Sequence, residues 1–525
     1  MKKIIILLII LWVYRAPSFT QGIYNDAARI VSDAGSYWVV DNGNFIFTSR
    51  DATNPATIAN LTINANASLI IEPQSFLSVS GILTNASGTD GLIIQSTSLG
   101  SGSLIHNTAD IQGTIQQHIE AETWNLISSP FLQGSGTTAR DLTPAGGSAY
   151  LRPYINGTAW GNYISEPDYQ FVPSQGYALW LTLEKILGFS GLLMNGTISK
   201  PLVYGPANNW NLVGNPYPSA LDWELVVRNN TSASMYLWEN TYAGFNNGNY
   251  MTYNALSRIG VPASTTNIIP LFQGFFVETA GTGAFISFNN NARLHSNQPF
   301  YKDFTRQTQV LVRLKITDTQ SRFDELLVCI NPDANNNFDE FDSKKMSAES
   351  ESPEIFSLAQ NEKLVINAVQ TLPIVIPVNI KATQAGTYTL KAFELMPDIN
   401  TTIQLEDIQA GNMTDLRAND ENTVDLLQGY NNNRFFLHFG RTNSIKEVEN
   451  NTLYTLVYKH QIYIYTTDNK VIDQLSLYDI SGRLITSQDC NSQRCLVNVA
   501  PLSNTVYIVK AMIGKEFVTK KVNVY

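Results

Sequence analysis

The part of the sequence best equipped for chemistry is a loop rich in acids and amides between residues 331 and 342. Its oxygen-bearing side chains recur at alternate positions, namely Asp333, Asn335, Asn337 and Asp339. Alternating oxygen ligands suit a hard cation such as calcium. The loop lacks the glycine at its sixth position and the glutamate at its twelfth that helix-loop-helix calcium sites carry. The sequence therefore leaves two interpretations open, a calcium site and a solvated acidic turn.

The three cysteines are a close pair and a single residue. Cys490 and Cys495 are separated by four residues, which predicts a small-loop disulfide if the protein is exported to an oxidising compartment. Cys329 lies in the apolar run Leu326-Leu-Val-Cys-Ile330 and is expected to be a buried strand residue.

Short motifs of the common enzyme classes are absent from the sequence. There is no His-Glu-x-x-His zinc site, no Gly-x-Ser-x-Gly elbow, and no Walker or dinucleotide glycine motif. The five histidines are scattered, and none forms a pair with metal-ligand spacing. A glycoside hydrolase needs only two carboxylates placed by the fold, and none of the 44 acids stands out as such a pair. We expect no enzyme activity and, calcium aside, no cofactor.

Residues 120–300 contain an internal duplication, with copies at about 120–205 and 206–300. Four segments of the first copy return in the second: Trp124-Asn-Leu as Trp210-Asn-Leu, Tyr150-Leu as Tyr236-Leu, Gly157 to Tyr163 as Gly244 to Tyr250, and Gln175-Gly-Tyr as Gln273-Gly-Phe. The first three offsets are 86 or 87 residues and the last is 98, which predicts an insertion near residues 255–270. We expect one β-rich unit per copy, packed face to face.

The duplicated region is rich in aromatic residues, and these have two interpretations. Trp124 and Trp210 are expected to anchor the two cores. Alternatively, flat rings beside asparagine amides suit sugar rings, and the candidates for such a platform are Trp160, Trp180, Trp238 and Tyr250. A sugar platform predicts that these rings are coplanar and exposed. An adhesive or structural protein predicts that they are buried or scattered.

The elements around these residues all read as β-structure, so we expect an all-β, multidomain chain. Residues 22–119 show short apolar triplets separated by polar turns, and Ile63, Ile71 and Val79 recur at eight-residue intervals. Such an array predicts a short parallel β-helix, with a β-sandwich as the alternative. Residues 301–440 show regularly spaced strands, with alternation at Tyr388, Leu390 and Ala392, which predicts a β-sandwich. A linker at 441–452 leads to a last β module at 453–525.

The N-terminus reads as a secretory signal at residues 1–21. Lys2-Lys3 precedes ten apolar residues, Ile4 to Val13, and small residues permit cleavage near Gln21. Ten residues are too few to span a bilayer, so we expect no transmembrane segment in the mature chain. The formal net charge of −10 includes +3 from the signal and +3 from residues 452–525, which leaves −16 for residues 22–451. An acidic body is not expected to bind nucleic acid.

The last module carries a set of characteristic residues, in a block ending in Asp-Ile-Ser-Gly-Arg, a late aromatic strand and a final basic strand. These residues are Leu475, Tyr478, Asp479, Ser481, Gly482, Arg483, Tyr507, Val509, Lys520 and Lys521. In this the module resembles the type A C-terminal sorting domain of the type IX secretion system, which is an immunoglobulin-like β-sandwich. The family usually has a glycine before the aromatic strand, where this chain has Asn504-Thr505. Asparagine tolerates positive φ, so this departure is mild.

The resemblance implies a route and a setting. The signal would take the chain to the periplasm, and the type IX machinery would recognise the sorting domain and export the protein to the cell surface or medium. The tail is commonly cleaved, and the body is released or attached through anionic lipopolysaccharide. The upstream region resembles uncharacterised adhesin-like surface proteins. We therefore expect an adhesin-like or structural protein, with a carbohydrate-binding or carbohydrate-degrading surface protein as the alternative and surface glycans as further partners.

Overall fold

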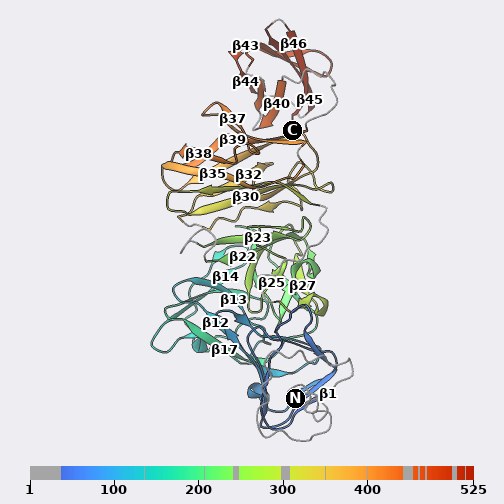
Figure 1. Ribbon diagram of the computed structural model, residues 1–525, viewed down its shortest axis with the longest axis vertical. Helices are drawn as coiled ribbons and strands as arrows, with labels where there is room; N and C mark the ends of the chain where they lie inside the picture. Colours follow the sequence, from blue (N-terminus) through green and yellow to red (C-terminus); the bar gives the residue numbers. More distant parts are fainter. Residues whose placement is uncertain are drawn as a thin grey trace, which may run out of the picture. The chain divides into compact units, whose positions relative to one another are not determined.

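The computed structural model describes residues 37–134, 136–205, 207–240, 248–296, 308–348, 351–398, 400–441, 453–458, 461–466, 470–498, 505–514 and 516–524. In these ranges the chain consists of β-strands joined by loops and short 3-10 turns, with no α-helix (Figure 1). The expected all-β, multidomain fold is confirmed. No helix in the described part is long and apolar enough to cross a membrane. The predicted signal peptide and, apart from Arg441, the predicted linker lie outside the described residues.

The first module is a parallel β-helix in which each coil contributes one strand to each of three sheets. The first sheet contains β1 (Tyr37–Val40), β4 (Asn60–Ile63) and β7 (Leu83–Asn85); the second contains β2 (Gly43–Phe47), β5 (Ala67–Ile71) and β8 (Leu92–Ile94); the third contains β3 (Ala56–Ile58), β6 (Phe76–Val79) and β11 (Ser103–His106). Leu61 pairs in parallel with both Trp38 and Leu83, so one coil takes 22 or 23 residues. A hairpin of β9 (Ser96–Thr97) and β10 (Gly100–Ser101) enlarges the third coil.

The eight-residue spacing noted in the sequence is the step from one sheet to the next within a coil. Ile63, Ile71 and Val79 lie on β4, β5 and β6, and all three side chains are buried. Each points into the same core from a different sheet. The predicted β-helix is confirmed. Its structural repeat is one whole coil of three strands, and the eight-residue spacing is only the distance between neighbouring strands of that coil.

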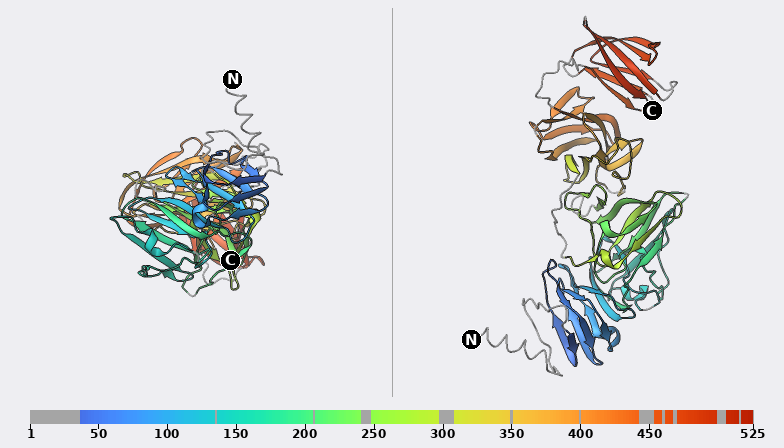
Figure 2. Two further views of the ribbon diagram at one scale, coloured as in Figure 1. Left: turned by 90° about the horizontal axis from the view of Figure 1, so that it is seen from below. Right: turned by 90° about the vertical axis from the view of Figure 1, so that its right-hand side faces the viewer.

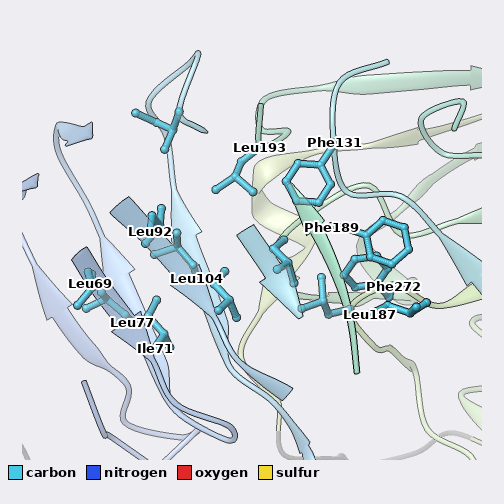
Figure 3. Packing of buried hydrophobic residues seen from close by; sticks show 14 of the residues in the cluster. Leu69, Ile71, Leu77, Leu92, Leu104, Phe131, Leu187, Phe189, Leu193 and Phe272 are labelled. Carbon is cyan, nitrogen blue, oxygen red and sulfur yellow. The ribbon is translucent and has the colours of Figure 1, made fainter. Parts of the chain in front are cut away.

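The β-helix continues without a break into the duplicated region. Its last strand, β12 (Gln112–Ile119), pairs in parallel with β8 and antiparallel with β17 (Lys185–Leu192) of the first copy. Figure 3 shows the consequence in the core, where Leu69 and Leu92 of the β-helix belong to the same apolar cluster as Phe189 and Phe272 of the duplicated region. The β-helix and the first copy therefore share one hydrophobic core.

The four strands of the first copy have counterparts in the same order in the second copy, which adds a fifth strand, and this confirms the duplication. The first copy has β13 (Trp124–Ser128), β16 (Gly176–Leu181), β14 (Ala149–Ile155) and β15 (Ala159–Trp160) in that order across its sheet. The second has β19 (Trp210–Gly214), β26 (Gly274–Thr279), β22 (Thr231–Glu239), β23 (Asn249–Asn254) and β24 (Ile259–Val261). The two sheets face each other across a cluster that includes Leu126, Tyr154, Leu212 and Phe276.

Strand pairing corrects two details of the predicted alignment between the copies. Ala178 and Phe276 are equivalent, because they pair with Leu126 and Leu212 respectively. Ala178 also pairs with Arg152, whereas Phe276 pairs with Tyr236. Tyr236 is thus the counterpart of Arg152, and its alignment with Tyr150 is wrong by two residues. The physical reason is the length of the connection before this strand: 20 residues separate β13 from β14, but only 16 separate β19 from β22. A bulge between Thr231 and Met235 in β22 restores two of the four missing residues.

The same register corrects the third aligned segment. Trp238 is the counterpart of Tyr154, and they pair with Tyr250 and Trp160 respectively. Tyr250 is therefore the counterpart of Trp160, and its alignment with Tyr163 is wrong by three residues.

Smaller elements complete the duplicated region. They are η2 (Ala139–Leu142), β18 (Ile198–Pro201), β20 (Ala220–Asp222), η3 (Trp223–Leu225), β21 (Val227–Asn229), β25 (Ile268–Ile269), β27 (Phe285–Phe288), η4 (Asn290–Ala292) and β28 (Arg293–Leu294), while η1 (Gly88–Gly91) lies in the β-helix. Two fully buried rings, Trp223 and Phe275, anchor the core of the second copy. Their ring centroids lie 5.6 Å apart.

The third module is one long hydrogen-bonded sheet that folds over on itself. Its strands are β37 (Asn412–Asp415), β36 (Thr401–Asp407), β39 (Gly429–Arg441), β34 (Ile374–Ala382), β32 (Glu354–Ala359), β33 (Glu362–Val369), β30 (Phe323–Ile330), β29 (Gln309–Thr317), β35 (Gly386–Leu395) and β38 (Glu421–Leu426), in that order, with β31 (Ser343–Lys344) beside β33. The last strand of this series, β38, lies close to β39. The Arg434 guanidinium of β39 donates a hydrogen bond to the Asp425 carbonyl of β38 at 2.6 Å. The predicted alternation is confirmed, since Tyr388, Leu390 and Ala392 are all buried.

By its contacts the chain divides into two compact units, the first ending at His438 and the second containing residues 439–525 with Asn400–Thr402. The second unit holds two small sheets, coloured red in Figure 2: β40 (Leu453–Tyr458), β41 (Gln461–Thr466) and β44 (Arg494–Asn498) in one, and β43 (Leu484–Ser492), β42 (Ile472–Asp479), β45 (Thr505–Ile513) and β46 (Glu516–Val524) in the other. Both sheets contribute to a single core, for example Ile464 from the first and Leu477 from the second.

Candidate functional site: the sorting module and the aromatic cluster

The turn between β42 and β43 is held together by one carboxylate. Asp479 Oδ1 accepts hydrogen bonds from the Ser481 hydroxyl at 2.6 Å and from the backbone N–H groups of Ser481 and Arg483. The Arg483 guanidinium pairs with Asp479 Oδ2 at 3.0 Å. Gly482 takes φ of +82° at the tip, which a side chain would strain. The hydrogen bond from the Ser481 side chain and those from Arg483 lower the pKa of Asp479.

The other characteristic residues of the module divide into buried and presented groups. Leu475, Tyr507 and Val509 are buried in its core. Tyr478, Ile508 and Lys521 are register partners on neighbouring strands and form a row on the opposite face of the larger sheet. Lys521 is exposed and Lys520 is half-buried. The module thus combines a packed interior with an outer row of one aromatic, one aliphatic and one cationic side chain beside the exposed turn.

A disulfide joins the two sheets of the sorting module. The structure pairs Cys490 on β43 with Cys495 on β44, with the Cα atoms 5.8 Å apart. Cys329 is a free thiol on β30 and is fully buried, which raises its pKa well above the ordinary value.

The four rings predicted for a sugar platform lie in the aromatic contacts of the duplicated region. Trp160 is perpendicular to Phe276, and Trp238 meets Tyr250 at 71°. Trp180 meets Trp124 at 64°. All four rings are half-buried, and Trp160, Trp238 and Tyr250 pack against the cluster between the two sheets. Edge-to-face contacts of this kind are typical of packed cores, and they do not form the coplanar, exposed surface that the sugar interpretation predicts.

The acidic loop uses its oxygens on its own backbone. The Asp339 carboxylate accepts from the backbone N–H groups of Asn335 and Phe341 at 2.6 and 2.8 Å, and Asn335 Oδ1 accepts from the Asn337 N–H at 3.1 Å. The Asp333 N–H donates to the side chain of Asn331. In the described part of the chain, no group of three or more His, Cys, Asp or Glu side chains is placed to hold a metal ion. These contacts are those of a succession of turns stabilised by side chains.

Two buried histidines lie where the β-helix meets the second copy. His295 bridges the hydroxyls of Ser78 and Ser103 at 3.0 and 2.8 Å. Burial, and to a smaller extent the Arg293 guanidinium, lower the pKa of His295 to about 3 and that of His106 to about 4. Arg293 itself donates to the His106 carbonyl at 2.6 Å. These histidines are therefore uncharged residues at the interface between the β-helix and the second copy. We call such an interface between two modules a joint.

A second joint, which no sequence pattern predicted, links the second copy to the third module. The Lys345 ammonium pairs with Asp324 at 2.5 Å, and both side chains are almost fully buried. The Asn249 amide donates to the same carboxylate at 2.9 Å. The partners lie 21 and 75 residues apart, so no local pattern could have connected them.

A small pocket in the first copy is lined mainly by loop residues. Its lining includes Ser129, Phe131, Thr137 and Gln170, and none of its lining residues has an ionisable side chain.

Comparison with known proteins supplies the export route. Residues 458–525 match the secretion system C-terminal sorting domain. The resemblance of the last module to the type IX sorting domain is thereby confirmed, and the chain is secreted through the periplasm to the cell surface or the extracellular space. No curated protein matches the chain. Among solved structures, the chain is similar to one described as "Biofilm associated protein - BSP domain", with 8% identity over 82% of this chain and 98% of that one. The TM-score of 0.15 is too low for that similarity to support an argument.

The body of the chain matches a second family model, separate from that of the sorting domain. The match extends over residues 36–439, from the β-helix to the end of the third module. The chain belongs to the family described as Domain of unknown function (DUF8693).

Proposed function

We propose that residues 36–439 form a non-enzymatic body, adhesin-like or structural, which the sorting module delivers to the cell surface. The observation that carries this proposal is the way the modules are joined. Each joint buries charged and polar side chains that are hydrogen-bonded to the neighbouring module. Such joints suit a body that transmits force or holds a binding surface at a fixed place, because breaking them would leave buried charges without partners.

The joint between the second copy and the third module shows the pattern most fully. The Asn254 amide donates to the Asp342 carbonyl at 2.9 Å, and the Arg313 guanidinium donates to the Gly260 carbonyl at 2.7 Å. The apolar side chains Ile259 and Val261 of β24 pack on Leu327 and Val365. Together with the hydrogen bond from Asn249 to Asp324, these contacts attach both β23 and β24 to the third module.

The ionisable groups of the body also support a structural role. Strongly perturbed acids and histidines are often catalytic, but three of the buried ionisable groups described in this chain are engaged in its joints. Asp324 pairs with Lys345, Glu278 pairs with Lys344 at 2.9 Å, and His295 bridges two serines. A carbohydrate-binding or carbohydrate-degrading body is the alternative, but the perpendicular arrangement of its aromatic rings does not favour it.

The proposal includes two partners of different kinds. The type IX machinery binds the sorting module. The lipopolysaccharide of the outer surface is anionic, and it is the proposed site of attachment after the tail has been cleaved.

The proposal is tested in the native host with the full gene and with a gene truncated after residue 452. We expect the full gene to give a product on the surface or in the medium that is shortened at both ends. The truncated protein should remain in the periplasm, and cells without a surface product should adhere less to surfaces and to one another. If cells that display the protein and cells that lack it adhere equally and have equally intact envelopes, the adhesive or structural role is contradicted. A glycan array probed with the secreted protein tests the alternative.

A further inference from the structure

The sheet face that carries Tyr236 and Glu278 in the second copy differs from the equivalent face of the first copy in what lies against it. In the second copy, a segment of the third module lies across this face. Ser343 and Ser234 share a hydrogen bond of 2.7 Å, and Tyr236 donates from its hydroxyl to the Lys344 carbonyl at 3.0 Å. Lys344 also pairs with Glu278 at 2.9 Å. Met346 then packs against the aromatic cluster. The second copy therefore holds an extended peptide, residues 343–346 of the same chain.

Strand pairing identifies the matching positions in the first copy. Trp124 pairs with Trp180, just as Trp210 pairs with Glu278. Trp180 is thus the counterpart of Glu278, and Arg152 is the counterpart of Tyr236, as shown above. The face that receives the peptide in one copy therefore carries two tryptophans and an arginine in the other.

In the first copy, Trp124, Arg152 and Trp180 together with the neighbouring Tyr150 and Tyr163 form what we call the aromatic rim. The side chains of Tyr150 and Tyr163 are 46% and 53% exposed, and their rings lie 5.9 Å apart. The Arg152 guanidinium lies 5.4 Å from the Tyr163 ring. Tyr150 pairs with Trp180, which continues the row across the sheet to Trp124. Clustered exposed aromatics around one arginine are typical of interface hot spots.

We infer that the aromatic rim is a docking site for an extended peptide segment of a partner protein, one that carries a carboxylate. The class of ligand follows from the second copy, where the equivalent face holds an extended peptide. The charge follows from the exchange of residues. The second copy presents Glu278 to a lysine, whereas the first presents Arg152 and replaces the glutamate with Trp180. This inference rests on the proposed adhesive function and specifies what the body adheres to.

The test uses the secreted protein as the host processes it and two labelled synthetic peptides, with fluorescence anisotropy as the readout. One peptide has the sequence of residues 341–348, Phe-Asp-Ser-Lys-Lys-Met-Ser-Ala. The other is identical except that both lysines are replaced by glutamate. We expect the glutamate peptide to bind more tightly, and Trp180→Ala and Tyr150→Ser to weaken its binding roughly tenfold or more. Phe393→Ser, which removes a 41% exposed ring from the third module, is the matched control and should bind as the parent does.

A charge exchange makes the test sharper. The double variant Arg152→Tyr, Trp180→Glu gives the first copy the residues of the second, and it should prefer the lysine peptide. Failure of both peptides to bind, or binding that the rim variants leave unchanged, would overturn the inference, as would binding of glycans to the rim in place of peptide. Cell adhesion separates this failure from that of the proposed function. If adhesion depends on the protein but not on Tyr150 or Trp180, only the docking site is wrong.

Discussion

Gln175 and Gln273 are equivalent residues of the two copies, and each donates its side-chain amide to a backbone carbonyl of the other copy. The acceptors are also equivalent, since Gln175 donates to Leu212 at 3.0 Å and Gln273 donates to Leu126 at 3.2 Å. The two copies thus meet about a pseudo-two-fold axis. The conserved Gln-Gly spacing within the duplication is explained by this contact, because the glycine after each glutamine lies against the backbone of the other copy.

The first prediction concerns Gly274, the glycine that follows Gln273. A Cβ at this position would lie 2.9 Å from the Ile127 carbonyl oxygen and 3.1 Å from the Leu126 carbonyl carbon. Because both atoms belong to backbone, they cannot move aside cheaply. We expect Gly274→Ala to lower the free energy of unfolding by about 1–3 kcal/mol, measured by denaturant unfolding. Gly188→Ala is the matched control, since a Cβ there meets no atom within 4 Å. Equal stability of the two variants would contradict the packing described here.

The second prediction concerns pH. Burial raises the pKa of Glu325 to about 7, although the cations Lys315 and Arg313 oppose the shift. A folded-state pKa above the unfolded one means that the protonated acid favours folding and that this contribution is lost as pH rises toward and through 7. Glu325→Gln should therefore be more stable than the parent at pH 8 and should unfold with a flatter pH dependence between pH 5 and 8. The upper limit is about 1.4 kcal/mol for each unit of pKa shift.

Thermal unfolding at pH 5, 6, 7 and 8 checks this prediction. The control is Glu166→Gln, which changes an exposed acid of the first copy and should follow the parent at every pH. The buried Asp342, whose pKa burial also raises to about 7, should leave some pH dependence in the Glu325 variant. A variant that loses stability equally at all pH values would show that Glu325 is needed for packing and not ionised near neutral pH.

The sequence predicted those parts of the fold that have a local period. The regular interval between Ile63, Ile71 and Val79 predicted the β-helix because successive strands of one coil have similar lengths and each ends in a buried residue. The duplication was visible because Trp124 and Trp210 begin matching strands. The alignment of Tyr236 failed because a shift of two residues keeps the same face of a strand toward the core, so that the hydrophobic pattern does not detect it.

The joints and the aromatic rim could not be predicted for a different reason. Lys345 and Asp324 meet only because β30 and the segment after β31 are brought together by the sheet. Tyr150 was noticed in the sequence only as part of the duplication, and its exposure depends on how the two copies face each other. For the acidic loop the spacing of oxygens was informative, but it did not distinguish a cation from the loop's own N–H groups as their partner.

The third prediction concerns the disulfide. Alkylation of the unfolded, unreduced protein should label Cys329 alone, and reduction should expose Cys490 and Cys495 as well, as mass spectrometry can count. Replacing both paired cysteines with serine should cost the sorting module about 2 kcal/mol, the amount expected for so short a loop. Cys329→Ala is the control for loss of a thiol elsewhere. The measurement uses the uncleaved precursor from the periplasm, which still carries the sorting module. Labelling of all three cysteines before reduction would show that the pair does not form in the native host.

The last prediction concerns recognition of the sorting module by the export machinery. Asp479 accepts three hydrogen bonds at one oxygen and pairs with Arg483 at the other, so Asp479→Ala should release the turn while leaving the buried core residues in place. We expect the variant to accumulate in the periplasm with its tail uncleaved, as detected by fractionation and intact mass. Asp489→Asn, a change at an exposed position on the neighbouring strand β43, is the control and should be exported normally. Normal export of Asp479→Ala would show that the machinery does not read the turn and would direct attention to the row of Tyr478, Ile508 and Lys521.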